Sequence, residues 1–102
     1  MGLAPLGDKL SAEQAQQFGM IWQVVEDDQL QAEAEKMAEH LAKQPTYGLS
    51  LIKKAINTAA HNTLDEQLLL ERDLQRLAGR SEDYREGVQA FMQKRTPAYK
   101  GC

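Results

Sequence analysis

Apolar residues recur at helical spacing along most of this 102-residue chain, and this pattern restricts the fold more than any other feature. The first clear stripe steps by four, three and four residues: Leu30, Ala34, Met37 and Leu41. Such steps place apolar side chains along one face of a helix. Similar stripes follow Thr46, Thr63 and Ser81. The sequence therefore predicts four main helices, preceded by a shorter one.

Helix-start and helix-stop signals separate these segments. Ser11 opens the stretch S-A-E-Q and Thr63 opens T-L-D-E, and both match a capping box. Asp27 or Asp28 is expected to cap the second helix, because aspartate accepts hydrogen bonds from free helical N–H groups. Gly19 is expected to end the short first helix in a left-handed turn.

One segment departs from the helical pattern. Residues 21–25 read IWQVV, a run of β-branched and aromatic side chains that is typical of extended backbone. No second run of this kind offers a pairing partner, so we expect an isolated strand or a buried connector. The predicted fold class is all-α, with short connections between helices.

The last two helices carry different apolar patterns. The helix after Thr63 has a wide leucine band around residues 68–70, which favours an external partner, either another domain or another subunit. On the final helix, Tyr84, Val88 and Phe91 share one stripe and are expected to face inward.

Composition excludes several classes of protein. The net charge of −3 and the pI of about 5.3 argue against a general nucleic-acid binder, which needs a broad basic face. No apolar run approaches the ~20 residues of a membrane span, and the start MGLAPLGDKL is no secretory signal. Cys102 is the only cysteine, so it forms no internal disulfide, and a reducing, cytoplasmic setting is expected.

The sequence contains neither a complete phosphate-binding loop nor a metal-binding motif. The stretch GLAPLGDK, residues 2–9, resembles a phosphate-binding loop, but Asp8 stands where the lysine belongs and Leu10 supplies no hydroxyl. His40 and His61 fall in no spacing that would place two metal ligands on one helical face. We expect no metal site.

The carboxylates of the Thr63 helix have structural explanations. Glu66 belongs to the cap, and Glu71 and Asp73 are expected to form a solvated face with neighbouring arginines. No serine, histidine and acid form a nucleophile pattern. The sequence offers no self-contained catalytic apparatus.

The closing stretch, residues 81–101, carries the strongest candidate for a binding site. Phe91 and Lys94 are three residues apart, which places them side by side on a helix, and Gly87 leaves a notch beside Phe91. An aromatic face beside an ammonium suits a flat heterocycle linked to phosphate, with Arg95 and Lys100 adding positive charge. Simpler readings remain open: a core phenylalanine, basic residues that complement the helix dipole, and a glycine that permits close packing.

Two stretches of the chain resemble segments of a known family. The closing stretch is similar to S-x-D-x-x-E-G-x-x-A-F-x-x-K-R-x-P of the enoyl-CoA hydratase/isomerase (crotonase) family. Residues 7–25 are similar to its G-x-x-[LI]-[ST]-A-E-x-A-x-x-x-G-x-[VI]-x-x-V-V segment. In finer detail, GMIWQVV and ERDLQRLAGRSEDYREGVQAF look most like the phenylacetate-degradation branch, whose members isomerise phenylacetyl-CoA derivatives.

The resemblance implies a role for the chain as a whole. Residues 1–102 correspond to the family's C-terminal helical region, which packs subunits into trimers or hexamers and covers the acyl-CoA pocket. By position, Phe91 and Lys94 match contacts to the adenine and phosphates of coenzyme A. The β/α spiral domain, with its oxyanion-binding N–H groups and catalytic acid, is absent from the chain, so the chain alone is expected to be inactive.

The partners that follow from the resemblance are an acyl-CoA and further copies of the chain, with no permanently bound cofactor. Neither a nucleic acid nor a membrane is expected as a partner. The alternative is a free-standing helical module that binds another protein through the Thr63 helix and has no affinity for CoA.

Overall fold

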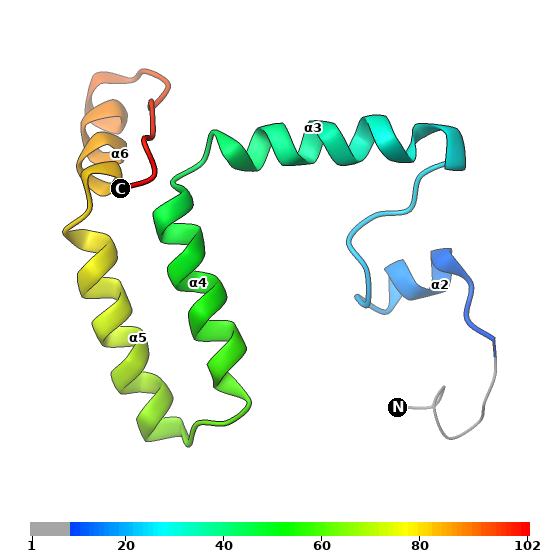
Figure 1. Ribbon diagram of the computed structural model, residues 1–102, viewed down its shortest axis with the longest axis horizontal. Coiled ribbons are helices and arrows are strands. Elements are labelled where there is room, and N and C mark those ends of the chain that lie inside the picture. Colours follow the sequence, from blue (N-terminus) through cyan, green and yellow to red (C-terminus); the bar gives the residue numbers. More distant parts are fainter. Residues whose placement is uncertain (1–8) are drawn as a thin grey trace. The chain divides into compact units, whose positions relative to one another are not determined.

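The computed structural model describes residues 9–102, and every regular element in that range is helical (Figure 1). The main helices are α3 (Leu30–Ala42), α4 (Thr46–Ala59), α5 (Leu64–Gly79) and α6 (Glu82–Gln93). The short α2 (Ala12–Gln17) precedes them. The all-α prediction with four main helices is confirmed. Most of the stretch that resembles a phosphate-binding loop, residues 2–8, lies outside the described residues. Within 9–102, every helix is too short or too polar to cross a membrane.

The chain divides into two compact units, residues 1–36 and 37–102, which are described separately. The described part of the first unit begins with the predicted capping box. The Ser11 hydroxyl accepts from the Gln14 N–H at 3.1 Å, and the Gln14 side chain accepts from the Ser11 N–H at 3.1 Å. Gly19 takes the predicted left-handed conformation, with φ of 76°.

Residues 21–26 form an irregular connector rather than a strand. The Val24 N–H donates to the Gln16 side chain at 3.2 Å, which ties the connector to α2. Trp22 is 82% exposed, so the expectation of a buried connector is wrong for its large side chains. Without a second extended run among residues 9–102, the β-branched residues have no strand to pair with.

The start of α3 also differs from expectation. The 3₁₀ turn η1 (Asp27–Gln29) leads into α3, and its N-cap is Glu26, which makes no side-chain capping bond. Asp27 and Asp28 therefore lie in the first turn instead of capping it. There they still complement the positive end of the helix dipole.

In the second unit, α4 and α5 form an antiparallel helical hairpin (Figure 1). The Gln67 side chain fixes the turn, because it donates to the Ala55 carbonyl at 3.1 Å and accepts from Asn62 at 3.0 Å. Thr63 caps α5 by accepting from the Glu66 N–H at 3.2 Å, and its hydroxyl donates to the Glu66 carboxylate. Leu74 is buried on the inner side of the hairpin.

The leucine surface of α5 is largely uncovered within this unit. Four leucines of α5 are at least 46% exposed: Leu64, Leu68, Leu69 and Leu77. This agrees with the prediction of more apolar surface than the chain itself can cover.

The prediction for α6 is wrong about which face is internal. Tyr84, Val88 and Phe91 are 57%, 48% and 83% exposed. The buried positions are instead Asp83 and Ala90. The cause is the C-terminal tail, residues 94–102, which folds back beside α6 and takes the place of an apolar partner (Figure 1).

Candidate functional site

Phe91 lies on the exposed stripe of α6 at an open groove of about 440 Å³. The start of α4, the end of α5, α6 and the tail all contribute to its lining, which includes Pro45, Ala78, Tyr84, Val88 and Tyr99. The ring of Phe91 is therefore available to a ligand or to another protein surface. The alternative that it is a core residue is wrong for the described structure.

Lys94 does not lie on the helix surface as the three-residue spacing predicted. α6 ends at Gln93, and Lys94 follows as its C-cap in a left-handed conformation with φ of 55° and ψ of 42°. The Lys94 and Arg95 N–H groups turn back to α6 carbonyls, and the bond from Arg95 to Ala90 measures 3.0 Å. This arrangement is a Schellman-type helix end, in which glycine is the usual left-handed residue. The turn, rather than helical periodicity, sets the direction of the Lys94 side chain.

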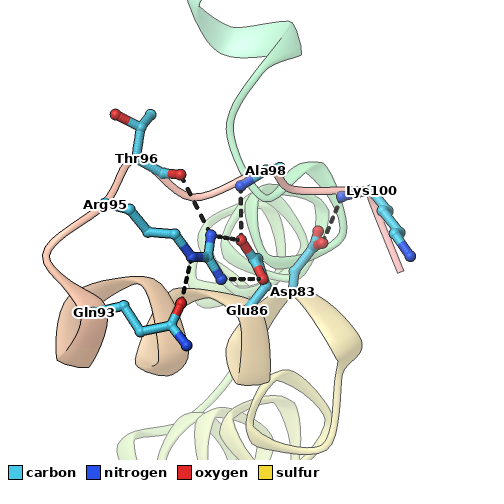
Figure 2. A network of polar contacts seen from close by, with 7 residues as sticks. All are labelled: Asp83, Glu86, Gln93, Arg95, Thr96, Ala98 and Lys100. Atoms are coloured by element: carbon cyan, nitrogen blue, oxygen red, sulfur yellow. Dashed lines mark hydrogen bonds and ion pairs between the residues drawn. The ribbon is translucent and has the colours of Figure 1, made fainter.

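Arg95 is neutralised by an ion pair instead of adding free positive charge. Its guanidinium donates to both carboxylate oxygens of Glu86, at 2.5 and 3.1 Å, and to the Gln93 side chain at 2.7 Å (Figure 2). The Ala98 N–H also donates to Glu86, at 2.9 Å. The bonds from Arg95 and Ala98 lower the pKa of Glu86 to about 2, and the Glu86 carboxylate raises the pKa of Arg95. We call this arrangement of Glu86, Arg95 and Ala98 the latch.

The end of the tail is held by a second carboxylate. Asp83 is 3% exposed and accepts from the N–H group of Lys100 at 2.7 Å (Figure 2). It also accepts from the N–H group of Gly101 at 2.8 Å. Its own N–H donates to the Cys102 carbonyl at 2.9 Å. A buried carboxylate needs such donors, because it has lost its water. We call these contacts of Asp83 with residues 100–102 the clasp.

Two glycines allow the tail to pack closely. A Cβ on Gly101, where φ is 82°, would lie 2.6 Å from the Thr46 hydroxyl oxygen at the start of α4. A Cβ on Gly87 would lie 3.3 Å from the Tyr99 hydroxyl oxygen. Gly87 therefore provides room for Tyr99 of the same chain. This agrees with the close-packing alternative. Gly87 and Tyr99 both line the groove, and a ligand at the notch stays a prediction.

A second groove, of about 290 Å³, lies between α4 and α5. It shares Gly48 and Ala78 with the first groove and is lined also by Leu51, Ile52, Ala55, Ile56 and Leu74. The two grooves together make an apolar surface across α4, α5 and α6.

The remaining candidates show no catalytic or metal-binding arrangement. His40 and His61 are exposed, and no group of three potential metal ligands occurs among residues 9–102. Asp73 pairs with Arg72 at the surface, as predicted, at 3.0 Å. Local desolvation and the nearby Glu82 carboxylate raise the pKa of the exposed Cys102 thiol.

Sequence reasoning assigned no role to Asp83 and Glu86, although both are in the motif that carried the resemblance. A usable signal was their spacing of three, which places both acids on one side of α6. The following tail, with a proline and a glycine, cannot continue the helix and carries free N–H groups.

Comparison with known proteins gives a consistent result. A sequence profile for the family described as enoyl-CoA hydratase/isomerase matches residues 1–102. The 1,2-epoxyphenylacetyl-CoA isomerase of Escherichia coli is 66% identical over 101 residues, which is 99% of this chain and 38% of that protein. The 2,3-dehydroadipyl-CoA hydratase of the same organism is 36% identical, over 93% of this chain and 37% of that protein.

Solved structures show the same relation. The crystal structure of an enoyl-CoA hydratase from Polaromonas sp. JS666 superposes with a TM-score of 0.86 and 35% identity. The match covers 92% of this chain and 37% of that one. The chain thus spans somewhat more than a third of the length of the relatives it matches.

Proposed function

The chain belongs to the enoyl-CoA hydratase/isomerase family, and from this we propose that it acts as the oligomerisation and acyl-CoA-covering portion of such an enzyme. The single observation that carries the proposal is the exposed Phe91 ring at an apolar groove, with a lysine three residues later at the helix end. The relatives that the chain matches are named for reactions of CoA thioesters.

The apolar surface supports the oligomerisation part. The α5 leucines and the α6 stripe of Tyr84, Val88 and Phe91 are exposed in a chain of only 102 residues. Contiguous apolar surface on a small domain is typical of an interface. We propose that it packs against other copies of the same enzyme, in a trimer or hexamer, and against the rest of each subunit.

The charge distribution supports the CoA-contacting part. Among residues 9–102 the Lys94 ammonium makes neither a hydrogen bond nor an ion pair, whereas Arg95 is occupied by Glu86. Coenzyme A presents a flat adenine next to phosphates, so the Phe91 ring would stack on the base and the Lys94 ammonium would contact a phosphate.

The chemistry of the thioester would take place elsewhere in the enzyme. A developing oxyanion needs N–H donors aimed at the thioester oxygen, and we propose that the rest of the enzyme supplies them. Binding of the remote nucleotide orients the acyl group and so lowers the barrier. We propose that this chain contributes that binding and that the parent enzyme isomerises a phenylacetyl-CoA derivative, because the 66% identical relative is a 1,2-epoxyphenylacetyl-CoA isomerase.

Titration of the chain with CoA tests the nucleotide contact. Lys94→Glu should weaken binding about tenfold, which is ~1.4 kcal/mol, because it replaces an attraction to phosphate by a repulsion. Lys54→Glu on α4 is the matched control, since it makes the same charge change at an exposed position and should alter the Kd little. Equal effects of the two substitutions on the Kd would show that Lys94 acts only through the overall charge of the chain.

The alternative function, a helical module that binds a protein partner without CoA, is favoured by one observation, the exposed leucines of α5. It predicts that Leu68→Ser abolishes partner binding while the chain has no affinity for CoA. Isothermal titration with CoA decides between the two functions, because only the first predicts heat of CoA binding, with an affinity that Lys94→Glu lowers.

A further inference from the structure

The backbone of Lys94 is held in an unusual conformation. It is the only non-glycine residue with positive φ among residues 9–102. A left-handed conformation brings the Cβ of an L-residue too close to backbone oxygen, so it persists only where the surrounding structure enforces it. The surroundings of Lys94 should therefore contain the groups that enforce it.

The latch supplies these groups from both sides of Lys94. Gln93, before it, and Arg95, after it, are joined by a side-chain hydrogen bond of 2.7 Å. Glu86, two turns earlier on α6, binds the Arg95 guanidinium with both carboxylate oxygens (Figure 2). The same carboxylate accepts from the Ala98 N–H at 2.9 Å. Segment 95–98 is thus drawn back along the helix, which requires the chain to reverse at Lys94.

The Lys94 side chain takes no part in the latch. The basic residue beside it, Arg95, carries the structural contacts, and the lysine ammonium remains available to an external anion. The two neighbouring basic residues therefore differ: Arg95 holds the turn, whereas the Lys94 ammonium has no partner among residues 9–102.

We propose that Glu86 is a positioning residue, which acts through Arg95 and Ala98 to aim the Lys94 ammonium at a phosphate of the CoA nucleotide. This inference rests on the function proposed above. Binding requires the latched conformation, so any loss of its population raises the apparent Kd in proportion. Glu86 itself touches no ligand.

Glu86→Gln gives a test in which positioning and simple electrostatics predict opposite signs. The substitution removes a negative charge and frees the Arg95 charge, so Coulomb attraction alone would tighten binding of an anionic nucleotide. Positioning predicts weaker binding, by about threefold if the latched fraction falls to a third. Titration with CoA at one fixed salt concentration measures the change. Glu82→Gln, one turn earlier on α6, is the matched control, because it removes the same charge and leaves the latch intact.

A double-mutant cycle separates positioning from a general effect on stability. Lys94→Met removes the ammonium and keeps the length of the side chain. With methionine at position 94, Glu86→Gln should no longer weaken CoA binding, because there is no ammonium to aim and only the tightening effect of the freed Arg95 charge remains. The backbone ³J coupling and chemical shifts of Lys94 report its left-handed conformation. They should change in Glu86→Gln and stay unchanged in Glu82→Gln.

Each result supports or overturns the proposal. Tighter or unchanged binding in Glu86→Gln, or an equal loss with and without the lysine, overturns it while the CoA-binding function stands. If the unchanged chain does not bind CoA, both proposals fail. Should Glu86→Gln release the tail altogether, Glu86→Asp serves as the second variant, because it keeps the charge on a shorter side chain. Positioning predicts that Glu86→Asp also weakens CoA binding, whereas charge alone predicts no change in the Kd.

Discussion

The two stripes of α6 differ in a way that reverses the usual relation between polarity and burial. One stripe, Tyr84, Val88 and Phe91, is apolar and exposed. The other contains Asp83, Gly87 and Ala90, and its acid and alanine are the most buried residues of the helix. The tail explains the difference, because its N–H groups need carboxylates and its Tyr99 ring needs the space at Gly87. The apolar stripe is left for surfaces outside the chain.

The largest effect should come from the buried acid. Asp83→Ala removes the acceptor of the part-buried N–H groups of Lys100 and Gly101, and each hydrogen bond to a charged group is worth about 1.5–3 kcal/mol. We expect unfolding of residues 37–102 to become easier by about 3 kcal/mol in urea denaturation followed by circular dichroism. Asp73→Ala, at a surface ion pair, should change stability by no more than about 0.5 kcal/mol. Similar losses of stability for Asp83→Ala and Asp73→Ala would contradict the difference drawn here between the buried and the surface acid.

Gly101→Ala should have the next largest effect. It forces alanine into a left-handed conformation and places a Cβ 2.6 Å from the Thr46 hydroxyl oxygen, for a loss of about 1–2 kcal/mol. Gly79→Ala is the matched control, because nothing lies within 4 Å of its added Cβ and alanine favours the helical conformation that this last residue of α5 adopts. The two glycine variants should thus move the thermal midpoint in opposite directions. Combining Gly101→Ala with Thr46→Ala should recover part of the loss.

Acidification should weaken the latch in a defined pH range. The pKa of Glu86 is lowered from 4.5 to about 2, so its stabilising contribution is complete above pH 4.5 and is lost as the pH falls towards 2. The carboxylate is partly open to solvent, so we expect a smaller effect than at Asp83. The difference in unfolding free energy between the unchanged chain and Glu86→Gln should shrink across this range. A difference in unfolding free energy that does not change with pH would contradict the lowered pKa of Glu86.

The exposed stripe should affect stability least. Val88→Ser should change the unfolding free energy by no more than about 0.5 kcal/mol, because Val88 is about half exposed and no polar contact depends on it. The same substitution should lower the tendency of the chain to self-associate, as measured by sedimentation at increasing concentration. Strong destabilisation without a change in association would show that this stripe is internal after all.

The parts of the fold that follow from local rules could be predicted from the sequence. Capping side chains at Ser11, Thr63 and Ser81 act on N–H groups three residues away, so a short stretch of sequence contains the complete interaction. Helical periodicity likewise locates the helices and their apolar stripes.

The parts that depend on distant contacts could not be predicted in this way. Hydropathy gives no means of recognising Asp83 as internal, because its partners lie 17 and 18 residues further along the chain. The position of Lys94 was misjudged because helical spacing was carried one residue beyond the helix end. Phe91 and Lys94 as CoA contacts remain a prediction that rests on family resemblance, and only a ligand measurement tests it.

The clasp has a consequence for hydrogen exchange. Terminal segments usually fray, and their amide protons then exchange with solvent within moments. Here the Lys100 and Gly101 protons lie against the oxygens of a buried acid, and the bonds of the clasp must break together before water reaches them. Their exchange rates should therefore report the opening of the whole tail, which makes these two amides a direct measure of how often α6 releases it.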